Sequence, residues 1–285
     1  MIIDFHTHTF PDSISKRVLE KLSCSGNAAY FTEGSLHSLS QSMQESGVDI
    51  SVNLPVMTRA DQVTEIHDNL FAESDKYEKS GVITFGGMHP LFEDYRNEIK
   101  RLREHGIKGI KIHPAFYNID INDIRVKRII DAATDEDMIV VTHSGADISF
   151  PDKNNASVEQ LLDVIEDVRP NKFVLAHMGG WQDWNAVLND LAGANVWLDT
   201  SFSLGQYYPR ESMKEQCRYT RNLDEKELVH LIRAHGSDKV LFATDSPWAP
   251  QKQYVDFIKD SNLTEDEKSK ILGQNAVSLL GIADR

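Results

Sequence analysis

Short apolar segments alternate with helix-like segments along the whole chain, and this alternation limits the possible folds more than any other feature of the sequence. Eight apolar runs of strand length are separated by amphipathic stretches and polar loops. Such a pattern is typical of βαβ units, in which crossover helices connect parallel strands. For 285 residues it predicts an α/β protein with one domain, residues 1–285, folded as an eight-stranded (β/α)8 TIM barrel.

The expected elements follow from runs of apolar residues and from Gly and Pro breaks. Beyond a first strand within residues 1–8, we expect strands at residues 48–54, 82–87, 107–113, 138–142, 172–176, 195–200 and 240–244. We expect helices at residues 14–22, 36–45, 60–79, 92–105, 124–135, 158–168, 181–191, 225–235 and, in several pieces, 253–280. A polar insertion after strand one (residues 11–35) could form a lid, and long loops after strands five and seven (residues 144–156 and 201–222) are expected to form much of the pocket.

Several strands end in a side chain that can bind a metal ion. The first ends in His6 and His8, which point to the same side because side chains alternate along a strand. His143 ends strand five, in register with the barrel-facing Ile139 and Val141. Imidazoles held side by side bind divalent metals such as zinc. Because the active-site groups of a barrel lie at the C-terminal ends of its strands, we expect these three histidines to meet at one metal.

Asp245 and His177 are the expected catalytic residues. Asp245 ends strand eight before a Ser-Pro dipeptide, and a metal site needs an anionic group that can take a proton from bound water. We expect Asp245 to be a ligand, the general base, or both, although an Asp in this position is also a good turn residue. His177 ends strand six before a Met-Gly-Gly sequence. We expect it to polarise the substrate or carry a proton, and direct metal ligation stays open.

Four more residues are candidates for substrate binding. Lys111 and His113 share the barrel-facing side of strand four, where a lysine is unfavourable unless it is paired or modified. Two interpretations stay open: a carboxylated Lys111 bridges a second metal, or the pair binds an anionic group of the substrate. His89 ends strand three and Trp248 follows strand eight, and each could line the pocket.

Other aromatic and basic residues have weaker positional signals. Trp181 and Trp184 follow strand six and could wall the pocket or pack in the core. Arginines of the loop after strand seven could bind an acid or lie on the surface: Arg210, Arg218 and Arg221. We expect most of the remaining histidines to lie on helix surfaces or in last helical turns: His37, His67, His105, His230 and His235.

The charge balance argues against some classes of partner. With 30 basic and 44 acidic residues the net charge is −14, and such a surface repels the phosphates of nucleic acids. Cys24 and Cys217 have no metal-type spacing, and no segment has the composition of a signal peptide or a membrane span. We expect a cytoplasmic protein that acts on a small molecule, without nucleic-acid or membrane partners, and for which a homodimer is a reasonable assembly.

In chain order, an HxH pair on strand one, a His on each of strands five and six and an Asp on strand eight resemble the pattern of the amidohydrolase superfamily. The fragments Lys-Ile-His-Pro at 111–114 and His-Met-Gly-Gly at 177–180 make the chain similar to the amidohydrolase-related branch, which contains aminocarboxymuconate-semialdehyde decarboxylase, resorcylate-type decarboxylases and hydrolases of lactones or amides. The resemblance implies one divalent metal, zinc before manganese or iron, with a second metal less favoured. The implied ligands are His6, His8, His143 and Asp245, with His177 as the nearby catalytic histidine.

Three functions are compatible with this pattern. The leading expectation is metal-dependent hydrolysis of an amide, ester or lactone bond in a small, carboxylate-bearing substrate by a metal-activated water. The alternative is non-oxidative decarboxylation or hydration of an unsaturated or aromatic acid. A third possibility is a non-catalytic metal-binding barrel, which the set of polar strand ends disfavours because buried charge without a partner destabilises a fold.

Overall fold

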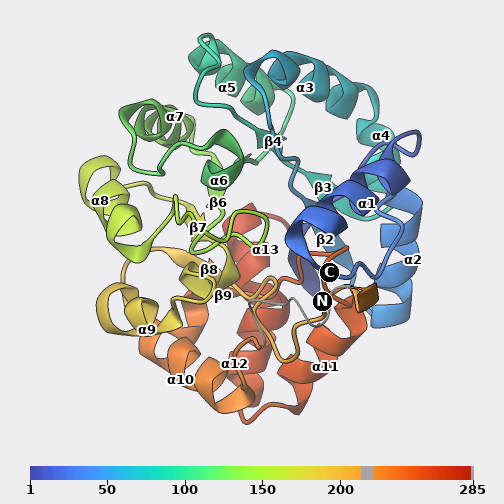
Figure 1. Cartoon of the computed structure of the whole chain (residues 1–285), viewed down its shortest axis with the longest axis vertical. Coiled ribbons are helices and arrows are strands. Elements are labelled where there is room, and N and C mark those ends of the chain that lie inside the picture. Colours follow the sequence, from blue (N-terminus) through green and yellow to red (C-terminus); the bar gives the residue numbers. More distant parts are fainter. Residues whose placement is uncertain (213–220, 284–285) are drawn as a thin grey trace.

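The computed structural model describes residues 1–212 and 221–283, and it contains the expected barrel of parallel strands (Figure 1). The strands run in two sheets, in the orders β1-β2-β3 and β4-β5-β6-β7-β8-β9, and every neighbouring pair is parallel. Their bounds are β1 (Ile3–Thr7), β2 (Ile50–Asn53), β3 (Val82–Thr84), β4 (Gly86–Gly87), β5 (Gly109–Ile112), β6 (Ile139–Thr142), β7 (Phe173–Leu175), β8 (Trp197–Asp199) and β9 (Val240–Leu241).

Backbone hydrogen bonds join the two sheets into a closed barrel. On one side, Phe5 N donates to Phe242 O (2.9 Å) and Asp245 N donates to His6 O (2.8 Å), so β1 lies beside the segment that follows β9. On the other side, Phe85 N, between β3 and β4, donates to Asn53 O of β2 (3.0 Å). The first and last strands therefore meet, as a barrel requires.

Helices surround the barrel (Figure 1). They are α1 (Ser15–Gly26), α2 (Leu36–Ser46), α3 (Val63–Ala72), α4 (Ser74–Lys79), α5 (Tyr95–Glu104), α6 (Pro114–Tyr117), α7 (Ile124–Asp135), α8 (Val158–Val168), α9 (Trp184–Ala186), α10 (Glu225–His235), α11 (Gln251–Asp260), α12 (Glu265–Ser269) and α13 (Asn275–Leu280). Within the described residues no helix is both long and apolar enough to cross a membrane.

Alternation along the strands produces two apolar cores. One lies inside the barrel and contains Phe5, Ile139 and Val141, and α13 contributes to it. The other contains Ile110 and Val140 together with residues of the surrounding helices. The predicted register of strands four and five is therefore confirmed, and it directs the side chains at positions 111 and 143 to the barrel side.

Two expected elements are interrupted. The strand predicted at residues 82–87 is divided into β3 and β4. A Cβ atom added to Gly86 would lie 2.6 Å from a methyl group of Leu102, and a Cβ atom added to Gly87 would lie 2.8 Å from the carbonyl oxygen of Pro55. The strand thus needs glycine where neighbouring groups approach its backbone closely. The helix predicted at residues 60–79 is divided by Glu73, which has a non-helical conformation, into α3 and α4.

Two of the histidines expected on helix surfaces or in last helical turns are buried. His67 lies inside its helix, which corrects that prediction, whereas His235 lies in the last turn of α10, as expected. The His67 ring lies between α5 and β4, with Nδ1 2.5 Å from Glu98 Oε1 and with Nε2 accepting the Gly87 N–H (3.2 Å). His235 Nε2 lies 3.0 Å from Val196 O, and its Nδ1 accepts a backbone N–H. Each buried ring is satisfied by partners distant in sequence, so helical position alone could not reveal its burial.

Candidate metal centre

His6, His8 and Asp245 meet at the C-terminal end of the barrel, where β1 adjoins the segment after β9. Asp245 Oδ1 lies 3.0 Å from His8 Nε2 and 3.4 Å from His6 Nε2. Burial raises the pKa of Asp245, and the neighbouring His8 opposes that shift. Asp245 has a backbone φ of 69°, in the left-handed region that non-glycine residues seldom occupy. The chain thus turns sharply at the point where this carboxylate enters the site.

Hydrogen bonds outside this group assign the ring tautomers of both histidines. His6 Nδ1 lies 2.9 Å from Asp199 Oδ2, and His8 Nδ1 lies 2.7 Å from Leu54 O. Both oxygens can only accept when the carboxylate is ionised, so each Nδ1 carries the hydrogen and each Nε2 presents its lone pair to Asp245. An N–H held in this way is the usual support of a metal-binding histidine.

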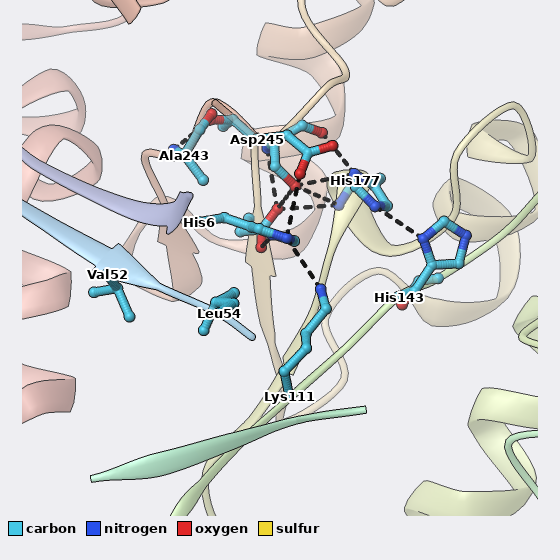
Figure 2. A network of polar contacts seen from close by, with 12 residues as sticks. His6, Val52, Leu54, Lys111, His143, His177, Ala243 and Asp245 are labelled. Atoms are coloured by element: carbon cyan, nitrogen blue, oxygen red, sulfur yellow. Dashed lines mark hydrogen bonds and ion pairs between the residues drawn. The ribbon is translucent and has the colours of Figure 1, made fainter. Parts of the chain in front are cut away.

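A second pair of histidines lies beside the first group. His143 Nδ1 and His177 Nε2 are 3.0 Å apart, and the His177 ring lies 5.5 Å from the His6 ring, centroid to centroid. Figure 2 shows His6, His177 and His143 in sequence across the barrel end. His177 Nδ1 donates to Ser201 O (2.9 Å), and His143 Nε2 donates to Ala146 O (3.1 Å). The two nitrogens that face each other therefore both carry lone pairs.

Burial keeps these two rings neutral. It lowers the pKa of His143 to about 3, and it lowers the pKa of His177 well below its usual value, an effect that the neighbouring His143 strengthens. Two lone pairs at 3.0 Å repel each other unless a proton is shared between the nitrogens or a cation binds beside both of them. Neutral imidazoles with fixed tautomers are the form of histidine that binds metals, and the group of His6, His8 and Asp245 fits a divalent ion. The pair of His143 and His177 offers two further imidazole nitrogens beside that group.

Lys111 lies beside both groups, in β5. Its Nζ is 3.0 Å from His6 Nε2, and the side chain is almost completely buried. Burial lowers the pKa of Lys111 to about 8, although Asp199 and Asp245 act in the opposite direction. Figure 2 shows the side chain reaching from its strand towards His6. The lysine expected on the barrel side is thus a member of the site, and its neutral form is more populated than in an ordinary lysine.

A third group contains His113, His143 and Asp147 but fits a metal less well. Asp147 Oδ2 is 3.5 Å from His113 Nε2 and 3.9 Å from His143 Nε2. The two rings are stacked, with centroids 4.5 Å apart and an angle of 20° between their planes. Since the lone pair of an imidazole lies in the ring plane, two stacked rings cannot direct their lone pairs at one ion. Burial raises the pKa of Asp147 to about 6, which suits it to hydrogen bonding.

A cavity of about 860 Å³ opens above these groups. His113, Trp181 and Trp248 line it, as expected, together with part of the polar insertion and of the loop after β6. His89 does not: its ring packs edge-on against Tyr117, 4.8 Å between centroids, and its Nδ1 accepts the Leu91 N–H. His89 is therefore not among the residues that line the cavity, and substrate binding by its side chain stays a prediction.

The remaining candidates lie away from the cavity or outside the described residues. The indole N–H of Trp184 donates to the His177 carbonyl (3.1 Å) while its ring packs on the core. Arg210 pairs with Glu20 (3.3 Å) and Arg221 pairs with Glu227 (2.6 Å). Two residues named in the sequence analysis, Cys217 and Arg218, lie outside the described part of the chain.

Asp199 is the residue that the sequence analysis missed. It ends β8 and is completely buried. One carboxylate oxygen faces His6 Nδ1, and the other accepts the backbone N–H groups of His177 and Ser201, each at 3.0 Å. The strand-end pattern that identified the other polar groups also applies to Trp197-Leu198-Asp199, so the signal was present.

Comparisons with known proteins concern the family and the fold of the chain. A protein-family model described as Amidohydrolase matches residues 3–282. No curated protein matches the sequence. Among solved structures, 5-carboxyvanillate decarboxylase from Novosphingobium aromaticivorans, complexed with manganese and a nitrobenzoic acid, is 16% identical, with a TM-score of 0.68 over 99% of this chain and 96% of that one.

Two further structures cover 98% of both chains. The 2,6-dihydroxybenzoate decarboxylase from Rhizobium is 12% identical, with a TM-score of 0.68. An uncharacterised TIM-barrel protein from Bordetella bronchiseptica is 17% identical, with a TM-score of 0.70. At such low identities the likeness concerns the fold alone, and the fold is the predicted barrel.

Proposed function

The chain belongs to the amidohydrolase family, and we propose that within it the protein is a metal-dependent hydrolase of an amide, ester or lactone bond in a small molecule. The observation that carries this proposal is the orientation of the histidine lone pairs. His6 and His8 direct theirs at Asp245, while His143 and His177 direct theirs at each other. Two adjacent cation sites are typical of enzymes that assist attack of water on a polar bond.

We propose that Lys111 connects the two sites. Its Nζ lies 3.0 Å from His6 Nε2, and an unmodified ammonium so close to two cation sites would be repelled. A neutral amine can attack CO2, forming an N–C bond and releasing one proton, and the resulting carbamate offers two oxygens. This arrangement, the less favoured one from the sequence, accounts for a lysine among imidazoles. It would give His143 and His177 a shared role as ligands.

Different side chains of the protein would then have separate roles in hydrolysis. Divalent metals bound here would polarise the scissile carbonyl and lower the pKa of water towards about 7. Asp245, whose own pKa is raised by burial, would take the proton from water and pass it to the leaving group. Asp199 would hold the His6 ring and the backbone at His177 in place through its two oxygens.

Decarboxylation is the second candidate, and the comparisons support it better than they support hydrolysis. Two of the structures described above are decarboxylases of aromatic acids, and one of them was solved with manganese. The same residues could hold a metal that orients an aromatic acid, with a neighbouring group delivering a proton to carbon. What favours hydrolysis in this proposal is the second pair of imidazoles beside Lys111, which a carboxylated lysine and a second metal would use.

One experiment separates the two candidates. The protein, purified without chelator and supplied with zinc or manganese, is assayed on amides, esters and lactones and, in parallel, on hydroxybenzoates and muconate-type acids for CO2 release. Elemental analysis of the same sample gives the metal content per chain. About two metals with turnover of an ester, amide or lactone supports the main proposal. About one metal with CO2 release replaces it by decarboxylation.

A further inference from the structure

We propose that the substrate of this site carries a bulky, uncharged, apolar group that occupies the outer part of the cavity, and that an acidic group is excluded there. The inference rests on the proposed function only in locating the reacting bond at the floor of the cavity. It changes the expectation of a small, carboxylate-bearing substrate. The observations behind it are the volume of the cavity, the origin of its walls and the charges along them.

One wall is helix α1, which belongs to the polar insertion after β1. Val18 and Leu22 are four residues apart and so form one stripe of the helix, and Ile14, its N-cap residue, directly precedes that stripe. All three line the cavity and are half-buried, whereas Arg17 on another face of the helix is exposed. The stripe therefore remains partly exposed to the cavity, because packing against the core does not bury it completely.

The opposite walls are also apolar. Ile66 comes from α3, Phe116 from α6, and Ile148 and Phe150 from the loop after β6, and each is half-buried and lines the cavity. Phe116 and Phe150 meet edge to face, 5.5 Å between centroids. The helix and the loop close on each other at Gly26, where a Cβ would lie 3.0 Å from a methyl group of Ile148. These walls enclose a space suited to a chain or ring system larger than the reacting bond.

The charges of the cavity oppose an acidic group. Among the described lining residues, arginine is absent and the two lysines are Lys111, at the floor, and Lys21, which is exposed on α1. The carboxylates that line the cavity are Glu65, Glu73, Asp147 and Asp245. Beyond the floor, then, a carboxylate on the substrate would meet apolar side chains, a few uncharged polar groups and like charges, with the exposed Lys21 as the one described cation, so its desolvation would be poorly compensated.

The test uses a neutral fluorescent probe, N-phenyl-1-naphthylamine, bound to the full-length protein and displaced by amides of increasing length. From butanamide to decanamide, we expect the displacement constant to fall two- to fourfold per methylene, the upper value corresponding to about 0.8 kcal/mol for each CH2 removed from water. The monoamide of decanedioic acid, in which a carboxylate replaces the terminal methyl group of decanamide, is expected to bind at least tenfold more weakly than decanamide.

Two variants of α1 provide matched controls. Leu22→Asn, in the stripe, should weaken decanamide binding about fivefold and leave butanamide unchanged, while Arg17→Asn, on the exposed face, should alter neither. Circular dichroism establishes that both variants are folded. Absence of chain-length dependence, equal binding of the terminal acid, or equal behaviour of the two folded variants would overturn the inference.

Turnover of 4-nitrophenyl esters from acetate to decanoate distinguishes this inference from the proposed function. If kcat/KM rises with chain length, both are supported. Chain-length-dependent binding without any turnover would contradict hydrolysis and support the apolar cavity. Turnover confined to the acetate ester would support hydrolysis and overturn the inference.

Discussion

At the scale of single residues, Asp199 is the group through which the two histidine pairs are held in one arrangement. Its Oδ2 faces His6 Nδ1, and its Oδ1 accepts N–H groups at the turn that follows β7 and at Ser201. That turn contains His177 and Met178 with φ values of 59° and 55°, so the backbone there depends on such support. The Asp199 carboxylate thus positions the His6 ring in the first site and the backbone at His177 in the second.

We expect Asp199→Asn to weaken metal binding 10- to 100-fold, because an amide gives His6 a weaker acceptor and no longer fixes its tautomer. Competition with a chelator, followed by elemental analysis, measures the change. The comparison variant is Asp260→Asn on the exposed end of α11, which should bind metal as the unaltered protein does. Equal metal affinity in Asp199→Asn and the unaltered protein would show that the carboxylate does not position the site.

A second residue-scale prediction concerns Lys111. Lys111→Met keeps an unbranched apolar side chain as far as the ε position and removes the amine, so we expect the metal content to fall from about two per chain to about one. The group of His6, His8 and Asp245 does not need the lysine and should retain its ion. Elemental analysis measures the content, and circular dichroism controls for folding. An unchanged content of two metals would exclude a connecting role for Lys111.

The sequence predicts the site to the extent that strand alternation determines it. Register alone indicates that His6, His8, Lys111 and His143 share the barrel side, because each lies two residues from another inward position. It does not indicate which nitrogen of each ring faces inward. That depends on acceptors far along the chain, such as Asp199 for His6, 193 residues away. The second histidine pair was therefore visible only in three dimensions.

At the scale of elements, local sequence signals predict where helices begin and end, whereas contacts with distant residues interrupt some of the predicted elements. The bounds of α8 and α10 agree with the sequence prediction, and in each helix an N-cap residue, Ser157 or Asp224, forms a capping box with its own neighbours. The break between β3 and β4 has a different origin, since Gly86 is crowded by Leu102 of α5. The residues next to Gly86 in the sequence do not indicate that contact with Leu102.

A buried ion network connects α3, α5 and β4 and makes stability depend on pH. Burial alone would raise the pKa of Glu98, but hydrogen bonds from His67 and Arg101 lower it from 4.5 to about 2. A carboxyl whose folded-state pKa is depressed stabilises the fold above its unfolded pKa. We expect this contribution to be complete above about pH 4.5 and to be lost as the pH falls towards 2.

Glu98→Gln tests this network. At pH 7 we expect it to lower the free energy of unfolding by about 1–3 kcal/mol, because charge-assisted hydrogen bonds to His67 and Arg101 are lost. The difference from the unaltered protein should shrink between pH 4.5 and pH 2.5, as measured by chemical denaturation. Glu104→Gln, on the exposed end of the same helix, serves as the control. A difference independent of pH would show that ionisation of Glu98 is not its source.

At the scale of the whole molecule, the site lies across the seam at which the barrel closes. His6 lies in the first strand, His8 directly follows that strand, and Asp245 follows the last. The same seam is held by hydrogen bonds from His8 N to Ser246 O (2.7 Å) and from Asp245 N to His6 O (2.8 Å). An ion bound by these side chains would therefore connect β1 to the segment after β9 and stabilise the closed barrel.

Removal of metal should consequently destabilise the protein, and most strongly at this seam. A ligand present at about 1,000 times its dissociation constant contributes about 4 kcal/mol, which corresponds to a fall in Tm of about 8–16 °C for a chain of this size. Without the ions, lone pairs of His8 and Asp245 face each other at 3.0 Å. We therefore expect amide hydrogen exchange to accelerate in peptides covering residues 1–10 and 240–250.

The positions at which amide hydrogen exchange accelerates distinguish destabilisation at the seam from destabilisation of the whole molecule. Helix α8 lies elsewhere on the barrel and contributes none of the proposed ligands, so peptides covering residues 158–168 should exchange at the same rate with and without chelator. Uniform acceleration throughout the chain would mean that the ions stabilise the molecule only globally. A metal-free protein with unchanged Tm and unchanged exchange at the seam would contradict metal binding at His6, His8 and Asp245, because ions held there cannot leave the seam unaffected.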